Sequence, residues 1–236
     1  IYMRINESFF INNNYNWELP SNFSGEKYLF FTYKTILPAQ TKASYLSSPK
    51  YFELKELVEK YDLTDNSVLI SEKLNIAREV RKNFITEFGT IKSGSMQELI
   101  LNPLSPDYDL SLSESINKMR QKCRKSTDYA QSLKNKMLER KIGNCTDIAL
   151  VTANEINKKQ GNCRGELLYA KILNDNVISN HVAVLVKNKS ESDKLTPDSI
   201  VLDNWLGGVF KYSDWLKIVK QIYNSKEVST YATQPE

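Results

Sequence analysis

The order of its predicted elements indicates an α+β fold. In the 236-residue chain, helical periodicity dominates from about residue 48 to about residue 141. A further helix is predicted over 145–160, and short segments rich in β-forming residues follow it as a meander. Such an order is typical of α+β proteins. We therefore expect a mostly helical N-terminal region, residues 1–110, and a second domain, residues 111–236.

The N-terminal region combines an irregular stretch with two helices. Residues 1–50 alternate aromatic runs, such as 27–37, with Asn, Ser and Pro, which is typical of strands and loops. Apolar residues at helical spacing predict helices over 48–61 and 65–88, the second of which ends before Gly89. We expect this region to pack on the second domain or to dock a substrate.

The second domain is predicted to begin with a long helix. A Pro-containing break at 101–109 precedes a helical stretch over 111–141, for which Ser111 or Ser113 is a suitable N-cap. The helix over 145–160 follows, with an apolar stripe and Gly161 as its stop. The remaining predicted elements are strands over 163–173, 181–188 and 199–205 and a closing helix over 212–225.

The composition narrows the function classes. The net charge of +4 comes from scattered basic residues, and the runs at 119–125 and 134–141 are typical of solvated helix faces. We therefore expect no nucleic-acid partner. No stretch reaches the ~18–20 consecutive apolar residues that a membrane span needs, so we expect no membrane-spanning segment. Three cysteines are too few for a disulfide framework, which favours a reducing compartment.

The tripeptide Gly-Asn-Cys occurs twice, ending at Cys145 and at Cys163. A helix over 145–160 spans about 22 Å, and the three steps that follow it recover at most ~10 Å. A disulfide needs Cα atoms within about 7 Å, so the two cysteines cannot pair while this helix exists. The same geometry excludes a shared zinc ion, and we expect no metal site.

The two cysteines lie in different predicted environments. Cys145 follows a turn-like Gly-Asn pair and opens the helix, where unpaired backbone N–H groups favour an anion such as a thiolate. Cys163 lies past a helix end, and Cys163 and Cys123 are interpreted as buried core residues. For Cys145, local chemistry alone leaves a nucleophile and a small core residue as equal alternatives.

A thiolate nucleophile needs an acid–base partner, and His181 is the only histidine. It stands at the mouth of an apolar predicted strand. Asp203 ends the next apolar strand, where a carboxylate can bond one imidazole nitrogen and fix the ring. The alternatives are a surface or turn histidine and a turn-initiating aspartate.

These motifs carry a resemblance to a known family. "GNCTDIALVTANEI", "NHVAVLV" and "IVLDNWLGGVF" resemble the papain-like cysteine hydrolases of bacterial toxins and effectors, including the glutamine-deamidating and YopT-like protease groups. The wider Cys-His-Asp clan includes transglutaminases and arylamine acetyltransferases. The resemblance covers residues 143–210. Asn204 departs from it, because the family commonly has Pro there.

The resemblance implies a papain-like core, in which a helix bearing the Cys packs on an antiparallel sheet bearing the His and Asp. Cys145 would be the nucleophile, His181 the base, Asp203 its orienter and Trp205 a packing residue beside the site. The family's oxyanion donors are the Cys backbone N–H and an upstream side-chain amide. The candidates for that amide are Asn144, Gln131 and Asn135.

The expected function is that of a cysteine amide hydrolase without metal or cofactor. By resemblance, it would deamidate a glutamine of a host protein or cleave a peptide bond, as a secreted bacterial effector acting in the host cytoplasm. Two alternatives stay open: transglutaminase-type acyl transfer to an amine, and a non-catalytic protein-binding module. Neither the substrate nor the oligomeric state follows from the sequence.

Overall fold

The computed structural model describes residues 49–66, 68–89, 91–92, 112–174, 177–192, 194–223, 225 and 227–235. The strands and loops predicted for residues 1–50 lie outside this part of the chain, apart from positions 49 and 50, which begin a helix. The predicted break at 101–109 and the predicted boundary between residues 110 and 111 also lie outside it, and the boundary stays a prediction.

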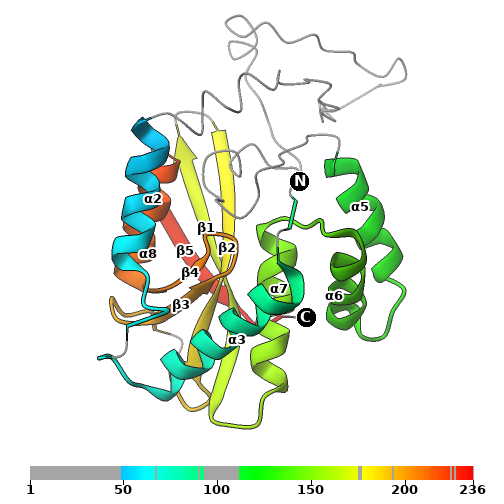
Figure 1. Ribbon diagram of the computed structural model, residues 1–236, viewed down its shortest axis with the longest axis horizontal. Helices are drawn as coiled ribbons and strands as arrows, with labels where there is room; N and C mark the ends of the chain where they lie inside the picture. The colour runs from blue at the N-terminus through cyan, green and yellow to red at the C-terminus, as the bar shows by residue number, and fades with distance from the viewer. Residues whose placement is uncertain are drawn as a thin grey trace, which may run out of the picture.

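A five-stranded antiparallel sheet forms the centre of the described structure (Figure 1). Its strand order is β4-β3-β2-β1-β5, so each neighbouring pair except β1–β5 is consecutive in the chain. The predicted α+β class and antiparallel sheet are confirmed. The strands are β1 (Cys163–Asn174), β2 (Val177–Asn188), β3 (Ile200–Asp203), β4 (Gly208–Lys211) and β5 (Glu227–Thr233).

Helices cover both faces of this sheet. Figure 1 shows α8 and α2 on one side, α3 and α7 on the other, and α5 and α6 packed beyond α7. The helices are α2 (Pro49–Tyr61), α3 (Glu72–Phe88), α5 (Leu112–Cys123), α6 (Tyr129–Arg140), α7 (Cys145–Lys158) and α8 (Tyr212–Ile222).

The predicted helix over 111–141 is wrong in one respect, because it is two helices. Asp128 accepts a hydrogen bond from the Gln131 backbone N–H at 2.9 Å and so caps α6, and residues 124–128 form a turn. Helix α5 begins at Leu112, so Ser113 lies inside it, and Ser111 lies outside the described residues. Asp128 therefore starts a new helix where apolar periodicity alone predicts continuation.

The other predicted elements differ mainly at their ends. The helix predicted over 65–88 begins at Glu72, because the Ser71 hydroxyl accepts the Leu74 N–H as its N-cap. Strand β2 begins at Val177, so His181 lies inside the strand and not at its mouth. Strands β4 and β5 were not predicted. Strand β4 has only four residues, and β5 alternates between half-buried and exposed residues. Strand β5 also follows the helix that was expected to close the domain.

Helices α2 and α3 share the hydrophobic core of the sheet. Leu54 of α2 and Phe84 of α3 belong to the same buried cluster as the strands. The chain after α2 also pairs with the edge strand β4: the Leu63 N–H donates to the Val209 carbonyl at 2.7 Å, and the Val209 N–H donates to Asp62 Oδ1 at 2.8 Å. Two helices of the predicted N-terminal region are thus built into the same core as the second domain.

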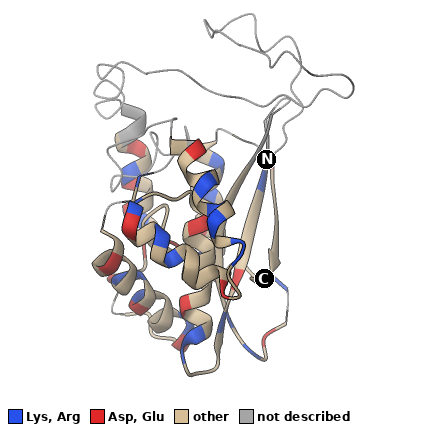
Figure 2. Cartoon of the chain, turned by 90° about the vertical axis from the view of Figure 1, so that its right-hand side faces the viewer, with Lys and Arg blue, Asp and Glu red and all other residues tan. Residues whose placement is uncertain are grey.

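Basic and acidic residues are interspersed along the helices on the face shown in Figure 2. In the first basic run, Arg120 bonds the buried Asp147, so this run is only partly solvated. In the second run, Lys134 contacts Glu87 and Glu155, and Lys136 contacts Glu139. This interspersed pattern is the one expected of a solvated helix face. Over the residues that were searched, every helix is too short or too polar to cross a membrane.

Helix α7 approaches β1 most closely at Gly165. A Cβ atom at this position would lie 3.0 Å from the Ala153 Cα and 3.1 Å from the Ala153 carbonyl oxygen. The contact is with backbone, which a rotamer change cannot relieve. A side chain at position 165 would therefore push α7 away from the sheet.

We predict that Gly165→Ala lowers the free energy of unfolding by about 1–3 kcal/mol, as overpacking does in well-packed cores. Urea unfolding followed by circular dichroism measures it. Ser229→Ala, at an exposed position of β5, is the control and should change the free energy of unfolding by less than about 0.5 kcal/mol. Equal stabilities of the two variants would contradict the tight α7–β1 contact.

Candidate active site

Cys145 is the first residue of α7. The preceding Asn144 has an extended backbone and serves as the N-cap, and its N–H donates to Asp147 Oδ2 at 2.9 Å. The side chain of Cys145 is half-buried. Its backbone N–H stands at a helix start, where N–H groups have no helical acceptor and favour a negative charge.

Asp203 ends β3, and its carboxylate accepts hydrogen bonds from four donors. Its Oδ1 accepts the backbone N–H groups of Trp205 at 3.1 Å and Leu206 at 3.0 Å. Its Oδ2 accepts the indole N–H of Trp215 at 2.8 Å and lies 2.6 Å from His181 Nε2. The side chain is buried. Four donors thus hold one buried carboxylate in place.

His181 is buried and directs its two ring nitrogens to different partners. Nε2 lies on Asp203, and Nδ1 has no hydrogen-bond partner that meets the usual distance and angle limits among the described residues. Cys145 is close enough to the ring to contribute to the rise in its pKa. Strand β3 pairs with β2 only at Val184–Val186, so His181 stands beyond the end of β3. The ring can therefore bond Asp203 through one nitrogen and face the thiol with the other.

The protonation of His181 is set by competing effects. Burial by itself lowers the pKa of the ring, but the charge and hydrogen bond of Asp203 and the neighbouring Cys145 outweigh it and raise the pKa to about 10. The imidazole therefore holds its second proton at neutral pH. A protonated ring beside a thiol favours a thiolate–imidazolium pair.

Aromatic rings surround the imidazole. The centroid of the His181 ring lies 4.9 Å from that of Trp205, 6.0 Å from that of Trp215 and 6.4 Å from that of Tyr223. Trp205 is thus located beside the histidine, where the resemblance put a packing residue. Trp215 was missed, because it lies on α8, outside the three motifs. Its place in the amphipathic pattern of α8 identifies it only as a core residue.

Asn204, the departure from the family pattern, links three elements behind the site. Its Nδ2 donates to Thr152 Oγ1 of α7 at 2.9 Å, and its Oδ1 accepts from Arg81 Nη1 of α3 at 3.3 Å. Arg81 Nη2 also donates to the Gly207 carbonyl at 2.7 Å. A proline could make neither side-chain bond, so the Asn ties the turn after Asp203 to both helices. Arg81 was not predicted, because it is about 70 positions or more away in the sequence from Thr152, Asn204 and Gly207.

The predicted oxyanion amides Gln131 and Asn135 do not reach the thiol, and this part of the prediction is wrong. Gln131 Oε1 accepts from Lys158 Nζ at 2.6 Å, and Gln131 Nε2 donates to Asn135 at 3.0 Å. Lys158 ends α7, about 20 Å from Cys145 along the helix axis. Asn144 adjoins Cys145 and is the candidate of the three that stands next to the site.

The other two cysteines are buried and all three are free. The predicted exclusion of a Cys145–Cys163 disulfide is therefore consistent with the structure. Burial raises the pKa of Cys163, and nearby Glu72 and Glu191 add to this rise, so its thiolate is disfavoured. Over the residues searched, no three His, Cys, Asp or Glu side chains gather as metal ligands.

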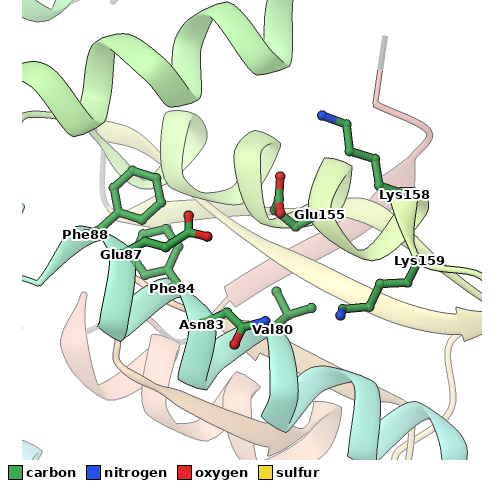
Figure 3. Close-up of a pocket in the computed structure, with 8 residues that line it drawn as sticks. All are labelled: Val80, Asn83, Phe84, Glu87, Phe88, Glu155, Lys158 and Lys159. Carbon is green, nitrogen blue, oxygen red and sulfur yellow. The ribbon is translucent and has the colours of Figure 1, made fainter.

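A cavity of about 130 Å³ lies between α3 and the C-terminal half of α7 (Figure 3). Its carboxylates Glu87 and Glu155 are both bonded to Lys134, and Lys158 is bonded to Gln131. The charges around it are thus paired, and the end of α7 that borders it is opposite to Cys145. The lining residues are Val80, Asn83, Phe84, Glu87, Phe88, Glu155, Lys158 and Lys159.

A thiol at a helix start, beside a His–Asp pair on an antiparallel sheet, is the arrangement of papain-like Cys-His-Asp proteins. The chain belongs to a family described as a transglutaminase-like domain, whose model matches residues 74–231, more than half of the chain. No curated protein and no solved structure matches. The predicted papain-like relationship is confirmed at this level, and the narrower assignment to bacterial toxins and effectors stays a prediction.

We predict that Trp215→Phe lowers the free energy of unfolding by about 1.5–3 kcal/mol, the range for hydrogen bonds to charged groups. A smaller aromatic ring replaces the buried indole, so the loss combines the N–H donated to Asp203 with the packing of the missing ring atoms. Tyr231→Phe changes an exposed ring on β5 and is the control. Urea unfolding measures both, and a Trp215→Phe variant as stable as the control would show that this bond contributes nothing.

The raised pKa of His181 also predicts how stability depends on pH. The unfolded ring has a pKa of about 6.5, whereas the folded one has a pKa of about 10. The native state therefore holds a proton that the unfolded state has lost, and stability falls as pH rises between these values. We expect the parent to lose more stability from pH 7 to pH 10 than His181→Gln does. Parallel losses in urea unfolding would contradict the raised pKa.

Proposed function

We propose that the protein is a cysteine-dependent enzyme that acts on an amide, with Cys145 as nucleophile, His181 as acid and base, and Asp203 as orienter. One observation carries the proposal: His181 bonds Asp203 through Nε2 at 2.6 Å, its Nδ1 has no hydrogen-bond partner among the described residues, and Cys145 contributes to the raised pKa of the ring. A non-catalytic binding module has no need of this arrangement. Membership of the transglutaminase-like domain family supports it.

The reaction follows from these positions. The Cys145 thiolate attacks the amide carbonyl carbon, and the backbone N–H at the start of α7 stabilises the oxyanion. His181 gives its Nδ1 proton to the leaving nitrogen as the C–N bond breaks, which leaves a thioester on Cys145. Water then attacks the thioester, gives a proton to His181 and releases the acid. Asp203 keeps the ring oriented throughout and stabilises its charged form.

The substrate we propose is the side-chain amide of a glutamine in a host protein. The resemblance of the Cys, His and Asp motifs to glutamine-deamidating effectors supports this choice over peptide-bond cleavage. On the same resemblance we propose that the protein is secreted by a bacterium and acts in the host cytoplasm. Cys145, Cys123 and Cys163 are free, and a reducing compartment would keep the nucleophile so.

A second candidate is transfer of the acyl group to an amine, and the family match favours it. The two reactions share every step up to the thioester and differ only in whether water or an amine attacks it. The described side chains around Cys145 do not distinguish between these two acceptors. The product does.

The nucleophile can be tested without a substrate. We predict that iodoacetamide alkylates Cys145 well below pH 7, and that Cys123 and Cys163 react slowly, as assigned by mass spectrometry. In His181→Ala, the Cys145 profile should move toward an ordinary thiol, with a midpoint near about 8.5. A Cys145 that is inert, or indifferent to His181, contradicts the enzyme and supports the binding module.

Turnover can be tested with casein and a blocked Gln-Gly dipeptide, with and without methylamine. We predict ammonia release and conversion of glutamine to glutamate in water, and loss of at least about a thousandfold in rate for Cys145→Ser. Cys163→Ser, in the second Gly-Asn-Cys tripeptide, is the matched control and should keep its rate. Methylamine incorporation in place of hydrolysis supports acyl transfer, and cleavage of casein supports a protease.

A further inference from the structure

The first turn of α7 carries a negative charge of its own. Asp147 is the third residue of the helix, two positions after Cys145, and is buried, with 2% of its surface exposed. It accepts the N–H of Asn144 and so helps to start the helix. A carboxylate this close to a thiol disfavours the thiolate, because two negative charges repel each other. The helix start that favours the nucleophile thus contains a group that opposes it.

Arg120 of α5 compensates this charge. Its Nε donates to Asp147 Oδ1 at 2.7 Å, and its Nη2 donates to Asp147 Oδ2 at 2.8 Å, which makes a planar two-bond ion pair. The same Oδ2 accepts the Asn144 N–H at 2.9 Å. One carboxylate therefore links the guanidinium to the residue immediately before Cys145.

The guanidinium and the thiol also interact electrostatically. Burial lowers the pKa of Arg120, but the hydrogen bond and charge of Asp147, with smaller contributions from Tyr129 and Cys145, outweigh it and raise the pKa. Arg120 is therefore a permanent cation in the neighbourhood of Cys145. Among the described residues, His181 from β2 and Arg120 from α5 interact electrostatically with the thiol, Asp147 lies two positions after it on α7, and Tyr129 from α6 faces Arg120 and Asp147.

We propose that Arg120 is a positioning residue that acts on Cys145 through Asp147. Arg120 neutralises the Asp147 carboxylate and holds it where it accepts the Asn144 backbone N–H. The pair removes the repulsion at the helix start and leaves the N–H groups of α7 and the His181 ring to favour the thiolate. The inference rests on the proposed function in that Cys145 is taken as the nucleophile. An ion pair that only joined α5 to α7 would affect stability and nothing else.

Two variants change the charge at this position in opposite directions. Arg120→Gln leaves Asp147 uncompensated, whereas Asp147→Asn leaves the cation and removes the anion. The double variant Arg120→Gln/Asp147→Asn removes both charges and keeps hydrogen-bonding side chains at both positions. Lys118→Gln is the matched control, because it removes a positive charge from an exposed position of the same helix, where Lys118 contacts only Glu114 among the ion pairs described.

The measurement is the pH profile of Cys145 alkylation by iodoacetamide in each folded variant of the full chain. We expect Arg120→Gln to move the midpoint up by about one pH unit, which approaches about a tenfold slower reaction at pH values well below the parent's midpoint. Asp147→Asn should move it down, and the double variant should return it close to that of the parent. Lys118→Gln should match the parent.

Profiles of Arg120→Gln and Asp147→Asn that coincide with that of Lys118→Gln would overturn the inference and leave a purely structural ion pair. If Arg120→Gln does not fold, Asp147→Asn and the double variant still test the inference. The alkylation midpoint of Asp147→Asn must then lie at lower pH than that of the double variant. A Cys145 that is inert in the parent contradicts the proposed function itself. A reactive parent whose profile the pair does not move contradicts only the role of Arg120.

Discussion

The site depends on the burial of a single carboxylate, that of Asp203. A buried charge is stable only when donors replace the water it has lost, and Asp203 receives two backbone N–H groups, an indole N–H and the imidazole. The backbone donors come from the turn after β3, and the indole comes from Trp215 of α8. The position of the Asp203 carboxylate that bonds His181 therefore depends on how α8 packs on the sheet. A change in the packing of α8 would move the Trp215 donor and so alter the environment of Asp203.

The thiol reaches this pair from the opposite layer. Helix α7 packs on β1 through the close approach at Gly165, which fixes its height above the sheet. Asn204 joins Thr152 of α7 to Arg81 of α3 directly beside Asp203. The cysteine helix and the His–Asp pair are thus held by a shared set of bonds, so their relative position does not rely on the apolar core alone.

The candidate site residues could be picked out from the sequence because each of the three carries a local signal. Cys145 follows a helix-start signal, His181 is the only histidine, and Asp203 interrupts an apolar run before a Gly-Gly turn. Each signal depends on neighbours within a few residues. The helix over 145–158 was predictable for the same reason, since Ile148, Val151, Thr152 and Ile156 form its buried stripe.

What could not be predicted depends on contacts between distant segments. Arg81 and Trp215 look like an ordinary helix residue and an ordinary core residue until the fold brings them to the turn around Asp203. Gln131 and Asn135 were taken as oxyanion candidates because they precede the cysteine, but the direction of α6 carries them to the far end of α7. The break of the 111–141 helix at Asp128 was hidden by apolar periodicity on both sides of it.

Asp203 and Cys145 together keep the His181 ring protonated at neutral pH. Because the chain has one histidine, the ¹⁵N and ¹H signals of its imidazole can be followed by NMR without assignment by mutation. The account predicts a doubly protonated ring at pH 7.5 that loses its proton only as pH approaches about 10. It also predicts that the second proton leaves at lower pH in Asp203→Asn. A ring that titrates near about 6.5 in the parent, as a free histidine does, would contradict it.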